Sequence, residues 1–276
     1  MGLGHDGTRA PPPAELRISS LIVGVIHRTV HFALLLPALC LTTCIIEPNP
    51  DPTLPPVQPV AAPDDSTDAP AGMAPDTVRY LALGDSYTIG ESVPDIGDWP
   101  NQLVDSLTLR LPDTHFEPAH ILATTGWTTA NLSNAMDAQQ IDTATFDLVS
   151  LLIGVNNQYQ GLPLDAYEVE FGALLERAVD LADGREDRVF VVSIPDYGYT
   201  PFGQGNQSTI SMELAQFNAA CSTLTVQAGI AHHDITGISQ QWNPMWVAPD
   251  GLHPSGAQYA AWVASFVDDV EQQLRD

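Results

Sequence analysis

A serine directly follows an apolar segment in the first half of the chain, where it could act as a nucleophile. Residues 81–90 read LALGDSYTIG, which places Ser86 just past the apolar run. A serine hydroxyl is a weak nucleophile unless a base removes its proton. The best candidate base is His253 in the segment DGLHP, and Asp250 lies three residues before it. In a tight loop such a carboxylate can accept the imidazole Nδ1–H, so Ser86, His253 and Asp250 form a candidate serine triad.

Two further segments offer hydrogen-bond donors for a developing oxyanion. ATTGWTT at 123–129 contains Gly126, whose backbone N–H can approach a ligand closely because the residue has no side chain. LLIGVNNQYQG at 151–161 contains Asn156, whose side-chain amide could donate. With the Ser86 N–H these groups make a candidate oxyanion hole of three donors. The candidate substrate-pocket residues beside these donors are Trp127, Asn157 and Tyr159.

The elements that must position these groups alternate between short apolar runs and amphipathic stretches. Helices are predicted over 165–183, with Asp165 and Glu168 as a capping pair, over 208–228, and from Pro254 onward. Such alternation favours a parallel sheet between helices, with the functional site at the carboxyl ends of the strands. Strands are predicted at 78–84, 120–124, 147–154, 188–194 and 231–236.

Four short motifs occur in the order of the conserved blocks of the SGNH (GDSL-type) hydrolases. They are GDSY at 84–87, the glycine at 126, GVNN at 154–157 and DGLH at 250–253. The third block usually reads Gly-x-Asn-Asp, whereas this chain has Asn157 in the last place. The chain most resembles the small bacterial esterases of the lysophospholipase-like branch, through the opening YLALGDSYTIGE followed by WPNQL.

This resemblance covers 77–276 and implies a flavodoxin-like, three-layer α/β/α sandwich with a five-stranded parallel sheet. It also implies Ser86 as nucleophile, His253 as base, Asp250 as its partner, and an oxyanion hole from Ser86, Gly126 and Asn156. We therefore predict a carboxylic ester hydrolase that forms an acyl-enzyme. No metal or organic cofactor is implied.

The substrate and two other function classes stay open at this point. Short acyl esters, lysophospholipids and acetylated glycans are all candidate substrates. An O-acyltransferase acting on cell-surface sugars would use the same residues. A non-catalytic, glycan-binding surface lipoprotein is the alternative outside enzymes, although such a module would not need all three triad residues.

The first 76 residues predict export rather than a folded domain. Residues 1–44 resemble a signal or lipoprotein leader, because Arg28 precedes the apolar run FALLLPALCLTTCII and LTTC ends in the candidate lipidation site Cys44. An uncleaved anchor is the alternative. Residues 45–76 hold nine prolines and no basic residue, which is typical of an extended tether. We expect a protein held on the bacterial cell envelope by a lipid, with the hydrolase domain at 77–276.

The charge of the chain limits its partners. It has 34 acidic and 9 basic residues and a formal net charge of −25. Nucleic acid is not an expected partner, because phosphate binding requires a basic surface. Contact with a membrane is expected only through lipid on Cys44, and the domain is expected to be a monomer. His232, His233 and Asp234 look like a metal cluster, but neighbours on a strand point to opposite faces, so no metal site is predicted.

Overall fold

The computed structural model describes residues 76–94 and 96–276. The predicted leader at 1–44, with Cys44, lies outside this part of the chain, as does all but the last residue of the predicted tether. Within the described part, no helix combines the length and the apolar character needed to cross a membrane.

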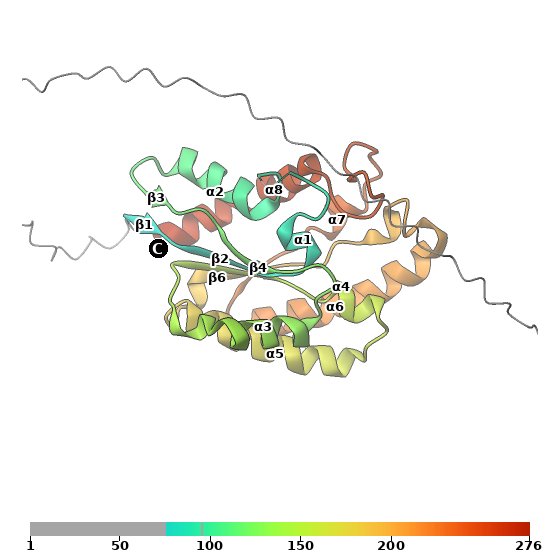
Figure 1. Cartoon of the computed structure of the whole chain (residues 1–276), viewed down its shortest axis with the longest axis horizontal. Coiled ribbons are helices and arrows are strands. Elements are labelled where there is room, and N and C mark those ends of the chain that lie inside the picture. The colour runs from blue at the N-terminus through green and yellow to red at the C-terminus, as the bar shows by residue number, and fades with distance from the viewer. Residues whose placement is uncertain (1–75, 95) are drawn as a thin grey trace, which may run out of the picture. The chain divides into compact units, whose positions relative to one another are not determined.

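A five-stranded parallel sheet forms the centre of the domain (Figure 1). The three central strands are wholly buried, as is typical when helices cover both faces of a sheet. A separate two-stranded parallel sheet consists of β1 (Thr77–Val78) and β3 (His115–Phe116). The strands of the main sheet, in spatial order, are β4 (His120–Ala123), β2 (Tyr80–Gly84), β5 (Leu148–Leu152), β6 (Val189–Val192) and β7 (Ala231–His233).

Helices cover both faces of the main sheet, which makes the predicted three-layer α/β/α sandwich (Figure 1). On one face α2 (Trp99–Arg110) packs against α8 (Gly256–Arg275). On the other face lie α3 (Thr129–Gln139), α5 (Leu164–Leu181) and α6 (Gln207–Gln227). The predicted strands and the two predicted internal helices all form, with bounds that differ by a few residues.

The predicted capping pair of one helix and the predicted start of another are wrong. Helix α5 begins after Pro163, which makes no side-chain cap, and Asp165 lies inside the first turn instead of capping it. Helix α8 begins at Gly256, where the Ser255 hydroxyl accepts from the N–H of Gln258. Pro254 does not start the helix, because it pairs with Val247 in an isolated antiparallel bridge.

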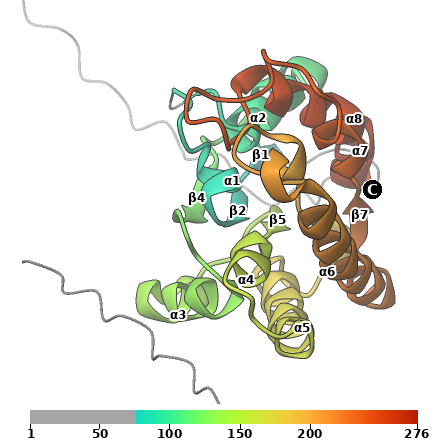
Figure 2. The same ribbon diagram turned by 90° about the vertical axis from the view of Figure 1, so that its right-hand side faces the viewer.

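The strand order places a topological switch between β2 and β5. Along the chain, β2 is followed by β4, which lies on one side of β2, and then by β5, which lies on the other side of β2. In open α/β sheets, ligands bind at the carboxyl ends of the strands beside such a switch. Figure 2 faces this edge, where α1 (Ser86–Ile89) follows β2 and α4 (Val155–Tyr159) follows β5.

Candidate active site

Ser86 opens the short helix α1 at the carboxyl end of β2, and the local sequence builds this turn. The Asp85 carboxylate caps the helix by accepting the Tyr87 N–H at 3.0 Å. Gly84 is required before it, since a Cβ there would lie 2.1 Å from the Thr88 hydroxyl. The N–H groups of the first helical turn have no intrahelical acceptor, so the Ser86 N–H is available to a ligand.

Asp250 and His253 form the predicted acid–base pair. The imidazole Nδ1 lies 2.7 Å from the Asp250 Oδ2. The other carboxylate oxygen, Oδ1, accepts the backbone N–H groups of Leu252 at 2.8 Å and His253 at 3.0 Å. Gly251 allows this tight loop because its φ is +76°, in the left-handed region that favours glycine. The loop therefore fixes the carboxylate and the imidazole relative to each other.

Burial and hydrogen bonding act on the Asp250 carboxyl in opposite directions. Burial alone would raise its pKa, but hydrogen bonds from Ser92, from the His253 ring and from the backbone of Leu252 and His253 outweigh burial. Together they hold the pKa of Asp250 well below its ordinary value. The carboxylate is therefore ionised at neutral pH, as a group that stabilises an imidazolium must be.

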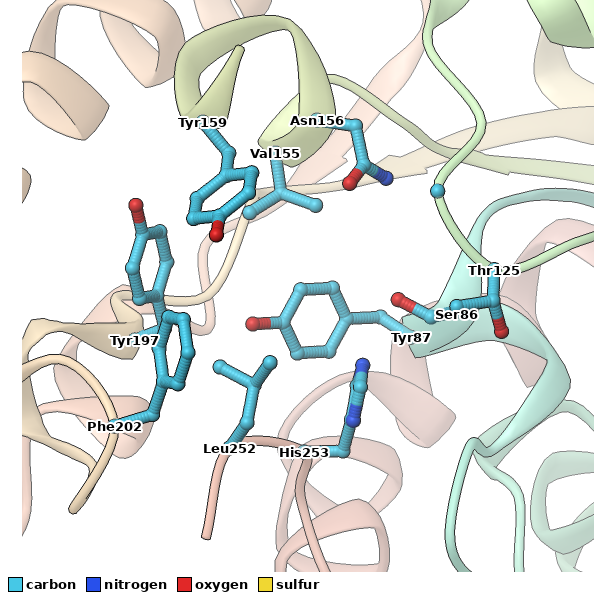
Figure 3. Close-up of a pocket in the computed structure, with 11 residues that line it drawn as sticks. Ser86, Tyr87, Thr125, Val155, Asn156, Tyr159, Tyr197, Phe202, Leu252 and His253 are labelled. Carbon is cyan, nitrogen blue, oxygen red and sulfur yellow. The ribbon is translucent and has the colours of Figure 1, made fainter. Parts of the chain in front are cut away.

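Ser86 and His253 come from opposite ends of the domain sequence, yet both line one cavity (Figure 3). The Tyr87 ring packs edge-on against the imidazole, with ring centroids 5.5 Å apart. Among the described residues, no hydrogen bond joins the Ser86 hydroxyl to the imidazole. Catalytic hydrogen bonds are often long in unliganded enzymes and shorten when substrate binds.

Asn156, one of the predicted oxyanion donors, lies across the cavity from His253 (Figure 3), and Gly126 lines the same cavity. The Asn156 Nδ2 donates one hydrogen to the Trp127 carbonyl at 2.9 Å, which orients the amide and leaves its second hydrogen for a ligand. Gly126 has a φ of +85°, and a Cβ there would meet nothing within 4 Å. The left-handed backbone, and not a lack of space, therefore explains the glycine at this position.

Of the three predicted pocket residues, only Tyr159 lines the cavity. Trp127 is partly buried and packs against the hydrophobic core. Asn157 is buried and structural: its Oδ1 accepts the Thr129 N–H at 3.1 Å, and its Nδ2 donates to the Thr129 hydroxyl at 2.7 Å. The amide thus joins α4 to the start of α3.

Several cavity residues were not predicted from the sequence. The cavity has a volume of about 250 Å³, and none of its lining residues is Asp, Glu or Arg. Tyr87, Thr125, Val155 and Leu252 are chain neighbours of predicted site residues, and this adjacency was the available signal. Phe202 carried no such signal, because its place depends on a hydrogen bond from its N–H to the Gly251 carbonyl at 3.0 Å. The other unpredicted lining residue is Tyr197.

The strand at 231–233 does not bring a metal site together. Within residues 76–94 and 96–276, no group of three or more His, Cys, Asp or Glu side chains is placed to hold a metal ion. Burial lowers the pKa of His233 to about 4, so this imidazole is neutral near pH 7. It stacks against Phe266 with ring centroids 5.0 Å apart, as a core residue does.

Comparison with known families gives the same assignment as this geometry. The sequence model of the GDSL-like Lipase/Acylhydrolase family matches residues 82–261, which contain all the candidate triad and oxyanion residues. The chain belongs to this family. It is therefore a carboxylic ester hydrolase. The chain is also 27% identical over 192 residues to an arylesterase of Vibrio mimicus, covering 68% of this chain and 86% of that protein.

Solved esterase structures share the fold. The psychrotrophic esterase EstA from Pseudoalteromonas sp. superposes with a TM-score of 0.55 at 15% identity, over 73% of this chain and 100% of that one. The acetylxylan esterase Axe2 from Geobacillus stearothermophilus gives a TM-score of 0.56 at 19% identity, over 72% of this chain and 95% of that one. At these identities the comparison concerns the fold alone.

Proposed function

We propose that this GDSL hydrolase cleaves carboxylic esters through an acyl-enzyme on Ser86. The observation that carries the proposal is the hydrogen-bonded Asp250–His253 pair, whose imidazole lines the same cavity as Ser86. The Ser86 hydroxyl attacks the ester carbonyl carbon while His253 Nε2 takes its proton. Asp250 holds the Nδ1–H and stabilises the imidazolium that results.

The tetrahedral intermediate places its negative oxygen against three donors, the N–H groups of Ser86 and Gly126 and the Asn156 amide. When the intermediate collapses, the carbon–oxygen bond to the alcohol breaks and the alcohol takes the proton from His253. Water then attacks the acyl-enzyme, gives a proton to His253 and releases the carboxylic acid. The Ser86 hydroxyl recovers its proton in this last step.

The cavity favours an uncharged substrate that carries a ring or a short chain. Tyr159, Tyr197 and Phe202 form an aromatic cluster, with ring centroids 6.2 to 6.4 Å apart. Tyr197 is fixed by donating to the Gln158 side chain at 2.9 Å, whereas Tyr159 and Phe202 are each more than half exposed. A long acyl chain would have to pass these two rings and run into solvent. We therefore propose short acyl or aryl esters over lysophospholipids.

The nucleophile is tested with a fluorophosphonate probe, which forms a covalent bond with an activated serine. Wild type is expected to take up the probe and Ser86→Ala to take up none. Ser265→Ala is the matched control, because its hydroxyl donates to the Trp262 carbonyl in α8. Equal labelling of wild type and Ser86→Ala would contradict the proposal.

The oxyanion hole is tested by Asn156→Ala. Loss of one such donor costs about 3–4 kcal/mol of transition-state stabilisation, so kcat is expected to fall by roughly 10²–10³-fold. Circular dichroism checks that the variant folds. A fall of less than about fivefold in kcat would remove Asn156 from the oxyanion hole.

The substrate class is tested with p-nitrophenyl esters of increasing acyl length, together with acetylated xylan and lysophosphatidylcholine. We expect kcat/KM to be highest for the shortest chains and for aryl esters. Replacement of Phe202 by Ala is expected to reduce this preference. Faster cleavage of long chains or of the lysophospholipid would contradict the proposed class, and acyl transfer to an added sugar would identify a transferase.

Export and a lipid anchor are proposed from the sequence alone. Metabolic labelling with a fatty acid is expected to mark the wild-type chain and not Cys44→Ser. Label on both chains, or on neither, would contradict lipidation at this cysteine.

A further inference from the structure

The segment that leaves α1 folds back onto the nucleophile residue. The N–H groups of Gly90 and Glu91 both donate to the Ser86 carbonyl. Gly90 is left-handed, with a φ of +70°, and Ser92 is also left-handed, with a φ of +66°. Glu91 and Ser92 are therefore held at fixed positions close to Ser86. We call these two residues the brace.

Ser92 connects the segment that carries Ser86 to the loop that carries Asp250 and His253. Its hydroxyl donates to the Asp250 Oδ2 at 2.7 Å, across 158 residues of sequence. The same oxygen lies 2.7 Å from the His253 Nδ1. Because Oδ2 takes Ser92 and His253 while Oδ1 takes two backbone N–H groups, the carboxylate has four hydrogen bonds and little freedom to rotate.

Glu91 connects the segment that carries Ser86 to the segment that carries Gly126. Its Oε2 accepts a hydrogen bond from the Thr125 hydroxyl. Thr125 directly precedes Gly126, and both residues line the cavity. Glu91 and Ser92 thus contact two of the three other segments that carry residues of the proposed reaction, those with Asp250 and with Gly126.

The backbone of Ser92 indicates that its hydroxyl matters. A left-handed φ favours glycine, and a serine Cβ is unfavourable there. The hydroxyl is the group that serine adds at this position, and it is the group that contacts Asp250. Ser92 itself is exposed and does not line the cavity, so it is not placed to touch substrate.

We propose that Glu91 and Ser92 are positioning residues that set the distance between the nucleophile, the His253–Asp250 pair and the Gly126 donor. Ser92 acts through Asp250, and Glu91 acts through Thr125. The inference rests on the proposed function, since it concerns three of the segments that carry residues of that reaction. It adds two residues that lie outside the triad and the oxyanion hole.

The Ser92 contact is tested with Ser92→Ala and Ser92→Gly. Both variants lose the hydroxyl, while glycine also relieves the backbone. A hydrogen bond to a charged group at a partly exposed site supports an expected fall of roughly 10-fold in kcat for both variants. KM is expected to change less than about twofold, because Ser92 does not line the cavity. Ser106→Ala is the control, since its hydroxyl donates within α2 to the Gln102 carbonyl.

A double-mutant cycle separates positioning from a structural role. If Ser92 acts through the carboxylate, Ser92→Ala in an Asp250→Ala background is expected to cause no further fall in kcat. A further 10-fold fall in that background would overturn the proposal, as would wild-type kcat in both Ser92 variants. Wild-type kcat in both variants would mean that a water molecule can replace the Ser92 hydroxyl at Asp250 without loss of activity.

Glu91 is tested by a second cycle with Glu91→Ala and Thr125→Val, which removes the hydroxyl at nearly constant volume. Each single variant is expected to lower kcat by about threefold, and the double variant by no more than either alone. Independent losses that multiply, or no loss in Glu91→Ala, would overturn this half of the brace.

Ser86→Ala is measured beside these variants. Wild-type activity in Ser86→Ala would remove the proposed function itself, whereas an inactive Ser86→Ala with unaffected Ser92 and Glu91 variants would remove the brace alone.

Discussion

Two carboxyl groups at this site, Asp85 and Asp250, are held in opposite states. Asp85 is completely buried and accepts the Tyr87 N–H, and among the described residues its Oδ2 has no hydrogen-bond partner. Burial outweighs that hydrogen bond and raises the pKa of Asp85 from its ordinary 3.8 to about 7. Asp250 keeps 29% of its side chain exposed and has four hydrogen bonds, which lower its pKa.

The difference shows that burial and the number of hydrogen bonds together, and not closeness to the nucleophile in sequence, decide which carboxyl carries charge. Asp85 is next to the nucleophile in sequence, but it is only a helix cap and is partly protonated near neutral pH. Asp250 is far away in sequence, but its four donors keep it ionised beside His253. The following predictions test this contrast, from the largest expected effect to the smallest.

Asp250→Asn is expected to have the largest effect. An amide cannot stabilise an imidazolium and can favour the wrong imidazole tautomer, so kcat is expected to fall by roughly 10³–10⁴-fold. The measurement is the rate of p-nitrophenyl acetate hydrolysis by purified protein. Asp165→Asn, in the first turn of α5, is the matched control. A loss below about 10-fold would mean that the charge of Asp250 is not needed.

Asp85→Asn is expected to leave kcat within about fivefold of wild type, because the amide oxygen can still cap α1. Asp85→Ala removes the cap, and its free energy of unfolding is expected to fall by about 1 kcal/mol. Urea unfolding followed by tryptophan fluorescence gives both stabilities. If Asp85→Asn lost as much activity as Asp250→Asn, the two carboxyl groups would not have different roles.

The pH dependence of stability should have opposite signs at the two carboxyl groups. For Asp85 the folded pKa is raised, so its contribution is fully present below about pH 4 and is lost as pH rises through about 7. The free energy of unfolding of Asp85→Asn, minus that of wild type, is therefore expected to increase from pH 4 to pH 8. A difference that stays flat would contradict burial of an uncharged Asp85.

For Asp250 the folded pKa is lowered, so its contribution is present above its ordinary value of 3.8 and is lost as pH falls below that value. The destabilisation caused by Asp250→Asn is expected at pH 7 and should shrink toward pH 3. Thermal unfolding at these two pH values measures this. The effect is the smallest of the set, because solvent reaches part of the side chain.

The sequence predicted those parts of the molecule that depend on local pattern and on strand order. Apolar runs predicted the three central strands of the main sheet, because buried parallel strands need apolar side chains on both faces. Ser86, Gly126 and Asn156 each come after a strand of this parallel sheet. Because the carboxyl ends of parallel strands lie at one edge of the sheet, the topology alone predicts that these three residues lie near one another. The pairing of Asp250 with His253 followed from their spacing in one loop.

The remaining features depend on contacts that no local pattern specifies. Phe202 reaches the cavity through a hydrogen bond to the distant Gly251, and Asn157 bonds to Thr129, which is 28 residues away. The cap of α5 and the start of α8 were mispredicted, because capping depends on the backbone geometry before each helix. Ser92 was missed because nothing near it in sequence indicates Asp250.

A covalent intermediate on Ser86 is the central claim, and trapping it tests the claim most directly. An aryl ester whose acyl group is released slowly is mixed with enzyme, the reaction is quenched in acid within its burst phase, and peptides are analysed by mass spectrometry. We predict one added acyl group per chain, on the peptide that contains Ser86, and none in Ser86→Ala. An acyl group on another residue, or steady turnover by Ser86→Ala at the wild-type rate, would contradict the account.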